Sequence, residues 1–335
     1  MTDDYSEVFR RFGIEPQEST YLYAPVFRGV IGGVAVAVKR THSPEAMGRW
    51  VRHLAGVGVP VVTPLAGPRR IGGYDWVAYP WIDGRTYDGS PADICAAGDL
   101  LGRLHVAGNA EGSTGLPGFE WPDHDEESVE EDVTGLDKVL KAYRPDLQGE
   151  VLGRFEPLLR SFMATTLPAI RDADLPVADV TMDFKAVNLV YSQAGPVLVD
   201  PDNGERAPRL LDLALAVLLF HNDLPDRPAR LFDEMEWAAF RDAYLGHVRL
   251  TVRERELWPA ALTYMLLEWG VWTAVNGGEV GDWDDPRQAA FLADLLTVDI
   301  TRYPLEWLAP GTVRQPPISG TSLLPHTDLA GPLDD

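Results

Sequence analysis

The chain has 335 residues, of which 45% are hydrophobic. This length exceeds what a single hydrophobic core usually accommodates and suggests two lobes or a large α/β unit. Its 51 acidic and 29 basic residues give a net charge of −22, which argues against a nucleic acid partner. The single cysteine, Cys95, excludes an intrachain disulfide and a cysteine metal site.

The sequence has no apolar stretch that approaches the length of a membrane span without a charge. The opening residues Met1 to Asp4 lack the basic start of a signal peptide. We therefore expect a soluble, cytoplasmic protein that has no membrane partner. The acidity is compatible with a cationic substrate, although an acidic surface is more often a feature of solubility.

The first third of the chain predicts strands and one helix. Residues 21–30 and 34–38 form two strands around a glycine turn, and a further strand pair runs around residues 72–79. Ser43, as the N-cap, and Pro44, at the first helical position, begin the helix that lies between these strand pairs.

From residue 91 onward the apolar residues have helical spacing. The expected helices are 94–105, 152–167, 210–220, 232–250, 253–275 and 288–301, and the third is apolar on nearly every face, as in a buried helix. The acidic residues 122–132 are expected to form a solvated loop or a helix start. Residues 310–335 are rich in Pro, Gly, Ser and Thr without periodicity, so we expect a loosely held tail.

The most informative stretch is Asp183-Phe184-Lys185-Ala186-Val187-Asn188, together with the apolar strand that ends at Asp200. Residues 188–199 are typical of a β-hairpin, which would place Asn188 and Asp200 where both reach one ion. An aspartate, an asparagine five positions later and a second aspartate after a hairpin indicate a phosphoryl-transfer site that uses ATP. Asp and Asn also favour simple turns, but the hairpin around them favours the ion site.

In such a site each of the three residues has a separate task. Asp183 would accept the proton of an attacking hydroxyl. Asn188 and Asp200 would hold Mg²⁺, which takes few hard oxygen ligands from the protein and leaves the other positions to phosphate and water.

Three residues of the first third would complete an ATP site. Lys39, at the end of the strand Val36-Ala37-Val38, matches the lysine that bridges the α- and β-phosphates in kinases. Glu45 is the acidic residue on the next helix that such a lysine would pair with, and a first-turn acid favoured by the helix dipole explains it equally well. No G-x-G-x-x-G loop precedes Lys39; Arg28 lies in this region and either assists a phosphate or is an ordinary exposed strand residue.

Residues 79–84, Tyr-Pro-Trp-Ile-Asp-Gly, follow a strand and precede the helical part, as an interlobe hinge does. The Pro80 carbonyl and the Ile82 amide are the expected partners of an adenine edge. Pro80 lacks an N–H group, so it contributes only as an acceptor.

With these motifs in place, the chain resembles the aminoglycoside phosphotransferase and choline kinase superfamily, the small-molecule relatives of protein kinases. The resemblance covers about residues 20–308 and includes the segments 99–105 and 212–214. It implies an α+β, bilobal, protein-kinase-like fold with a small antiparallel-sheet N-lobe and a large, mainly helical C-lobe. It also implies that Asp212 supports the catalytic loop from a buried helix.

The expected boundaries follow from this resemblance. Residues 1–82 would form the N-lobe and end in the hinge, residues 83–309 would form the C-lobe with the catalytic loop and acceptor site, and residues 310–335 would form the tail.

Two departures from the family pattern concern the catalytic loop. Thr181-Met182 stand where the family usually has His-Gly, and Lys185-Ala186 stand where it often has His-Pro. Lys185 either lies near the transferring phosphate, where a cation would offset charge on its oxygens, or neutralises an acidic loop.

The resemblance implies transfer of the γ-phosphate of ATP, with Mg²⁺, to a hydroxyl of a small-molecule natural product such as an aminoglycoside-like antibiotic. Acidic side chains of the helical half would bind its amines, and the candidates are residues 123–132, Glu268, Asp282, Asp284 and Asp285. A Ser or Thr hydroxyl of a precursor peptide in a lanthipeptide-like pathway is an alternative acceptor. A third alternative is an inactive kinase fold that serves as a binding module; the joint presence of the ATP and metal residues argues against it.

Overall fold

The computed structural model describes residues 4–20, 24–108, 114–122, 125–225 and 228–306. The chain divides into two compact units, Met1–Tyr303 and Pro304–Asp335. The tail expected over residues 310–335 lies outside the described residues. Within the described ranges, no helix is both long enough and apolar enough to cross a membrane.

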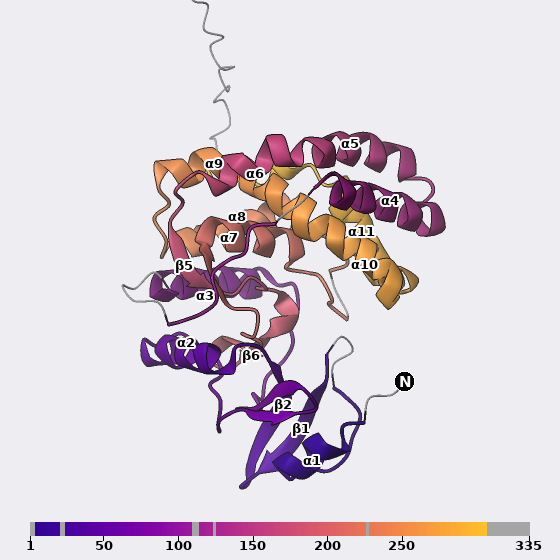
Figure 1. Ribbon diagram of the computed structural model, residues 1–335. Helices are drawn as coiled ribbons and strands as arrows, with labels where there is room; N and C mark the ends of the chain where they lie inside the picture. The colour runs from indigo at the N-terminus through magenta and orange to yellow at the C-terminus, as the bar shows by residue number, and fades with distance from the viewer. Residues whose placement is uncertain (1–3, 21–23, 109–113, 123–124, 226–227, 307–335) are drawn as a thin grey trace, which may run out of the picture. The chain divides into compact units, whose positions relative to one another are not determined.

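The first unit begins with a four-stranded antiparallel sheet in the order β1-β2-β4-β3 (Figure 1). Its strands are β1 (Val26–Ile31), β2 (Val34–Thr41), β3 (Arg69–Ile71) and β4 (Tyr74–Pro80), and its helices are α1 (Ser6–Phe12) and α2 (Pro44–Gly56). Gly32 and Gly33 have φ angles of 59° and 83°, a backbone that glycine adopts at little cost, and they form the predicted turn between β1 and β2.

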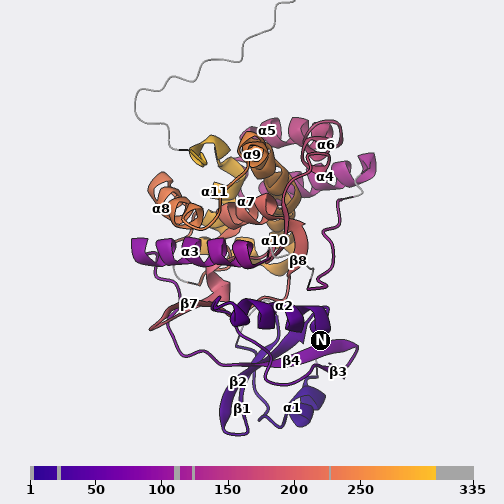
Figure 2. The ribbon, with the colours of Figure 1, turned by 90° about the vertical axis from the view of Figure 1, so that its left-hand side faces the viewer.

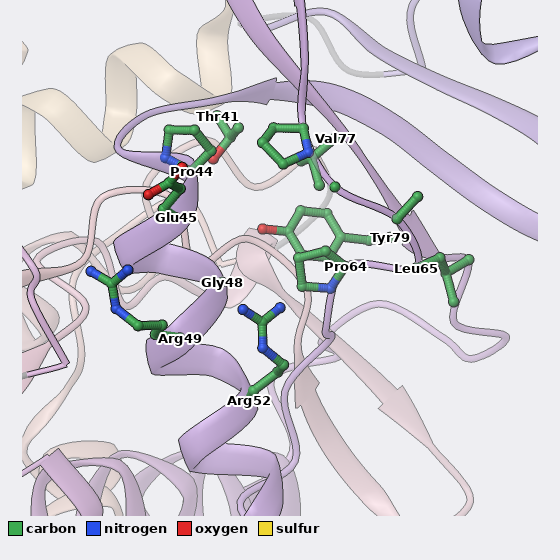
Figure 3. Close-up of a pocket in the computed structure, with 13 residues that line it drawn as sticks. Thr41, Pro44, Glu45, Gly48, Arg49, Arg52, Pro64, Leu65, Val77 and Tyr79 are labelled. Atoms are coloured by element: carbon green, nitrogen blue, oxygen red, sulfur yellow. The ribbon is translucent and has the colours of Figure 1, made fainter.

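The two faces of this sheet have different partners because side chains alternate along each strand. One face packs on α1 through a core that includes Phe9, Phe27, Val38 and Trp76. Helix α1 was not predicted from the sequence. On the other face, Thr41, Val77 and Tyr79 point toward α2; Figure 3 shows this arrangement.

The remainder of the first unit is mainly helical (Figures 1 and 2). Its α-helices are α3 (Pro91–Gly108), α4 (Glu126–Tyr143), α5 (Gln148–Ser161), α6 (Thr166–Arg171), α7 (Arg209–Leu219), α8 (Glu234–Leu245), α9 (Val252–Met265), α10 (Val271–Val280) and α11 (Pro286–Thr297). Short turns of 3₁₀ helix are η1 (Phe162–Ala164), η2 (Ala186–Asn188), η4 (Asp282–Asp284) and η5 (Ile300–Arg302), and η3 (Leu266–Gly270) is a π turn. Two small antiparallel sheets pair β5 (Val177–Val180) with β8 (Glu205–Pro208) and β6 (Leu189–Ser192) with β7 (Gly195–Leu198).

Several helix predictions are confirmed with shifted bounds. Helix α7 is buried at every residue, as its apolar sequence predicts. Helix α8 is shorter than the expected 232–250: Asp233 caps its N-terminus in a capping box, and the helix ends at Leu245, before Gly246. The helix predicted over 253–275 is divided by the π turn η3, and residues 126–132 of the acidic stretch form the start of α4. Strands β5 and β8 were not predicted.

Close packing of α3 on α8 depends on glycine. A Cβ atom built at Gly98 would lie 2.2 Å from the carbonyl oxygen of Phe240, so this position has room for hydrogen alone. The contact fixes α3, which carries His105 toward α7.

The hairpin β6–β7 is tied by backbone hydrogen bonds to the segment between α2 and β3 and to the residue that follows the hinge. Val62 N donates to Leu198 O over 3.0 Å, and Arg85 N donates to Tyr191 O over 3.1 Å. Val197 of β7 and Val199, which follows it, also pack on the cluster that contains Val77 and Tyr79 of β4. These contacts bring the end of the hairpin next to the end of β2, where the site is built.

Candidate active site

The hairpin β6–β7 brings together the two predicted metal ligands. Leu189 pairs with Leu198 in its ladder, and Val199 N donates to Asn188 O over 2.9 Å. Asn188 and Asp200 therefore stand side by side just beyond the paired residues. The hairpin is confirmed, and its register explains the spacing of the two residues in the sequence.

Asp183 is held by amide and ammonium groups. Asn188 Nδ2 donates to the backbone oxygen of Asp183 over 2.9 Å and to its Oδ2 over 3.0 Å. Asn203 Nδ2 donates to the same Oδ2 over 3.1 Å, and Lys185 Nζ lies 3.0 Å from Oδ1. Because Asn188 uses its amide nitrogen for Asp183, its amide oxygen is left as a possible metal ligand.

Burial raises the pKa of the Asp183 carboxyl above its usual range; the Lys185 ammonium opposes this rise and the nearby Asp200 adds to it. A carboxylate in such surroundings is more basic than a free aspartate. This property suits a group that receives a proton from a hydroxyl.

Lys39 extends from β2 toward Asp200 and is 7% exposed. Its Nζ forms an ion pair with Asp200 Oδ1 and a second one, of 2.8 Å, with Asp202 Oδ2. Burial opposes the charge of Lys39, but the two carboxylates outweigh it and raise the pKa of Lys39 above its usual value. The ammonium group is therefore charged in the folded protein.

Lys185 is the centre of a second set of ion pairs. Its Nζ lies 2.9 Å from Asp223 Oδ2 as well as 3.0 Å from Asp183 Oδ1. The ion pairs thus form two neighbouring sets, Lys39 with Asp200 and Asp202, and Lys185 with Asp183 and Asp223. Four carboxylates and two ammonium groups carry a formal excess of two negative charges, which equals the charge of one divalent cation. The oxygen donors of Asn188 and Asp200 fit Mg²⁺, which takes hard oxygen ligands.

The start of the loop that carries Asp183 is held by Asp212 of α7, which is fully buried. Asp212 Oδ2 accepts from Thr181 N over 3.1 Å, and Oδ1 accepts from Thr181 Oγ1 over 3.0 Å. His105 Nε2 donates to Asp212 Oδ2 over 2.9 Å, and the Tyr244 hydroxyl donates to His105 Nδ1 over 2.9 Å. Helices α3, α7 and α8 thus converge on one loop residue.

The backbone conformation at Met182 bears on one departure from the family pattern, the absence of glycine before Asp183. Its φ angle is 49°, in the left-handed region that favours glycine, and glycine is the residue that the family usually has there. Burial of the Met182 side chain, which is 6% exposed, offsets part of this strain.

The residues expected to bind the nucleotide lie along β1 and the hinge. The Arg28 guanidinium lies 4.6 Å from the centre of the Trp81 ring, a cation–π contact. Trp81 N donates to Ala35 O over 2.9 Å, which ties the hinge to β2. Pro80 ends β4, and the Ile82 N–H donates to no backbone carbonyl in the described ranges. The Ile82 amide thus has no competing backbone partner there.

The expected pair of Lys39 with Glu45 is absent from the ion pairs of the described residues. Glu45 lies in the first turn of α2 and lines a cavity of about 460 Å³ with Arg49 and Arg52 of the same helix (Figure 3). The opposite wall includes Tyr79 of β4. The carboxylates that reach Lys39 come instead from the segment after β7.

The acidic residues proposed for substrate amines lie in different settings. Asp125 accepts from Ser128 N over 2.9 Å and Asp285 accepts from Arg287 N over 2.8 Å, so each caps a helix. Glu268 lines a small pocket with Asp132. Asp282 and Asp284 lie in η4, and residues 123–124 lie outside the described residues.

Five residues of the site were not assigned a role from the sequence. His105 and Thr181 form hydrogen bonds with Asp212, and the other three are Asp202, Asn203 and Asp223. One signal was available, because Asp202 follows Asp200 by two positions in an Asp-Pro-Asp sequence. The others are joined to their partners by the fold alone.

The chain matches a known protein family in sequence and several solved structures in fold. Residues 33–256 match the model of the phosphotransferase enzyme family. No curated protein matches the sequence. Among solved structures, the amicoumacin kinase hAmiN is 16% identical, covers 90% of this chain and 95% of its own, and has a TM-score of 0.56.

Two further structures have the same fold. A microcompartment-associated aminopropanol kinase is 12% identical, with 90% of this chain and 100% of its own covered and a TM-score of 0.59. An aminoglycoside phosphotransferase from Alicyclobacillus acidocaldarius is 16% identical, with 84% and 91% covered and a TM-score of 0.51. These matches confirm the bilobal α+β kinase fold. Because the family model spans more than half of the chain, the chain belongs to the phosphotransferase enzyme family and is a phosphotransferase.

Proposed function

We propose that the protein transfers the γ-phosphate of ATP, with Mg²⁺, to a hydroxyl of a small-molecule natural product such as an aminoglycoside-like antibiotic. The observation that carries this proposal is the convergence of Lys39, Asp183, Asn188 and Asp200: Lys39 pairs with Asp200, Asn188 donates to Asp183, and the backbone of Asn188 is hydrogen-bonded to the residue before Asp200.

The residues fit ATP and Mg²⁺ in chemistry. Asn188 and Asp200 would hold the metal, Lys39 would bind phosphate oxygens, and Pro80 and Ile82 would face the adenine. When bound, Mg²⁺ supplies positive charge that offsets the charge of the phosphate oxygens. The similar hAmiN was solved with AMP-PNP and Ca²⁺, which supports a nucleotide with a divalent cation in this fold.

Asp183 would act as the general base. The acceptor hydroxyl oxygen forms a bond to the γ-phosphorus, the bond from that phosphorus to the β–γ bridging oxygen breaks, and ADP leaves. The hydroxyl proton passes to Asp183. Asn188 and Asn203 hold the carboxylate in place, so the protein contributes position and charge rather than a covalent intermediate.

Lys185 would balance charge next to Asp183, since it lies between Asp183 and Asp223. Its ammonium group is also near enough to Asp183 to approach the transferring phosphate. Arg28, which lies over Trp81, would stiffen the hinge side of the nucleotide site. Residues 1–82 and 83–309 remain the proposed lobes.

A small hydroxylated acceptor is favoured by the similar structures, which include an amicoumacin kinase and an aminopropanol kinase. The net charge of −22 also suits a substrate that carries amines. A precursor peptide is the alternative acceptor, and an inactive binding module is the alternative without chemistry.

The test is an acceptor screen with ATP and Mg²⁺, read by mass spectrometry. The acceptors tested are aminoglycosides, amino alcohols, nucleosides and peptides that contain Ser or Thr. Each is incubated with the wild type and with Asp183→Asn. We expect one class of small molecule to gain a phosphate with the wild type alone. Phosphorylation of peptides only would replace the small-molecule proposal, and no product together with no nucleotide binding would support the binding module.

A further inference from the structure

Lys39 needs a counter-charge that stays in place when the nucleotide binds. It is buried and charged, and leaving such a group without a partner is costly. Of its two carboxylate partners, Asp200 is also the proposed metal ligand, so its charge would be shared with the cation. Asp202 is then the partner that Lys39 keeps.

Asp202 is fixed to the face of the sheet that carries Lys39. Its Oδ1 accepts from Thr41 Oγ1 over 2.7 Å and from the Tyr79 hydroxyl over 3.3 Å. Thr41 follows Lys39 by two positions on β2, so both side chains are on one face, and Tyr79 pairs with Ala37 of the same strand. Three side chains of the N-lobe sheet therefore define where Asp202 lies.

Helix α2 contributes to this arrangement through packing. Gly204 N donates to Pro201 O over 3.1 Å, which closes the turn after Asp200. A Cβ atom at Gly204 would lie 2.6 Å from the ring of Trp50, a fully buried residue of α2. The turn thus rests directly on α2, while Glu45 of the same helix is exposed at the cavity in Figure 3.

We propose that Asp202 is the positioning residue for Lys39, in the role that an acid of α2 was expected to have. This inference rests on the proposed function, because it requires Lys39 to bind the nucleotide. It assigns to Glu45 no part in nucleotide binding.

The test is a fluorescence titration with mant-ATP, in Mg²⁺ and separately in EDTA, on the wild type, Asp202→Asn, Lys39→Met and the double variant. We expect Asp202→Asn to weaken binding about tenfold in both conditions, the range for a hydrogen bond to a charged group. The double variant should bind no more weakly than Lys39→Met, because Asp202 acts through Lys39.

Two further variants isolate the effect. Glu45→Gln distinguishes the two candidate partners and should stay within about twofold of the wild type. Asp179→Asn is the matched control, since Asp179 is also buried and is held by Arg206 at 3.1 Å and by the Thr114 hydroxyl at 2.6 Å. It should lower the melting temperature without weakening mant-ATP binding.

If Asp202→Asn does not fold, Thr41→Val replaces it, with an expected loss of about threefold that vanishes in the Lys39→Met background. The inference is overturned by additive losses in the double variant, by a loss with Glu45→Gln in place of Asp202→Asn, or by a loss confined to Mg²⁺, which would make Asp202 a metal ligand. Failure of the wild type to bind mant-ATP at all would instead refute the proposed function.

Discussion

The charged side chains of the site are paired with one another, so the effect of each residue depends on its partners. Asp183, Lys185 and Asp223 form one chain of ion pairs, and Asp200, Lys39 and Asp202 form another. Asn188 lies between them, since its side chain donates to Asp183 and its backbone carbonyl accepts from Val199, the residue before Asp200. Removing one charge therefore changes the partners of its neighbours, and each substitution below is paired with a measurement specific to one role.

Replacing the proposed base should separate transfer from binding. We expect Asp183→Asn to lower the rate of phosphoryl transfer by about 10²- to 10⁴-fold, the usual contribution of a general base. Affinity for mant-ATP should change little, because the amide keeps the size of the side chain. The measurement is turnover with the acceptor found in the screen, beside a mant-ATP titration; turnover close to that of the wild type would remove Asp183 from this role.

Replacing the proposed metal ligand should act on binding. Asp200→Ala is expected to abolish the gain in nucleotide affinity that Mg²⁺ gives to the wild type, because a hard oxygen ligand is lost. Mant-ATP titrations over a range of Mg²⁺ concentrations measure this gain. An unchanged dependence on Mg²⁺ would contradict the metal assignment.

His221 makes stability depend on pH. It is 2% exposed, its Nδ1 donates to Arg230 O over 2.9 Å, and its Nε2 accepts from the Tyr87 hydroxyl over 3.0 Å. Burial lowers the pKa of His221 from 6.5 to about 4, and the bond to Arg230 opposes this only in part. Between these values the unfolded chain binds the extra proton, so the stabilising contribution is present above pH 6.5 and is lost as the pH falls toward 4.

The expected loss from His221 is about 2 kcal/mol between about pH 7 and about pH 5. In His221→Gln, which cannot titrate, the difference in unfolding free energy between these two pH values should shrink by about this amount. Urea unfolding at both pH values measures it. Equal pH dependence in the wild type and the variant would show that His221 is protonated alike in both states.

At the scale of elements, the site is placed by close contacts between helices and loops. Helix α7 reaches the loop through Asp212, α3 reaches Asp212 through His105, and α3 itself packs on α8 at Gly98. The geometry of the loop that carries Asp183, the proposed base, therefore depends on helix packing some distance from it in the sequence.

Gly98→Ala tests this packing. The added Cβ would meet the Phe240 carbonyl oxygen at 2.2 Å, so the helices must move apart, and we expect a loss of about 3 kcal/mol in unfolding free energy. Gly153→Ala is the matched control: it lies in α5 with no atom near the new Cβ and should gain about 0.5 to 1 kcal/mol from helix propensity. Similar unfolding free energies for the two variants would contradict the role of Gly98.

The sequence predicts elements and residues that depend on local order. The hairpin β6–β7 joins adjacent segments, so its turn and apolar pattern were sufficient to pair Asn188 with Asp200. Strand β8 has the sequence Glu-Arg-Ala-Pro, without alternation, and pairs with a strand far back in the chain. Helix α1 has seven residues, too few for a reliable helical period.

The partner of Lys39 could not be predicted from local sequence, because it lies far from Lys39 along the chain. Asp202 meets Thr41 across 161 positions of sequence, and long-range contacts bring it there, among them the packing of its turn on Trp50. Glu45, which is near in sequence, lies in the first turn of α2 at the cavity. A local sequence pattern can suggest a candidate acidic residue, but the fold determines which acidic residue lies next to Lys39.

At the scale of the whole molecule, the proposed N-lobe would supply a lysine and a hinge, and the proposed C-lobe would supply the base and the metal ligands. The family match over residues 33–256 spans both parts. The acidity of the chain, with a net charge of −22, would favour the approach of a cationic acceptor, and this attraction should weaken as salt rises.

A crystal structure of the protein with Mg²⁺ and AMP-PNP tests the central claim most directly. We expect one Mg²⁺ bound by the Asn188 amide oxygen and the Asp200 carboxylate, with Lys39 on the phosphates and Asp183 beside the γ-phosphate. A nucleotide bound away from these four residues, or a metal held by other ligands, would contradict the account.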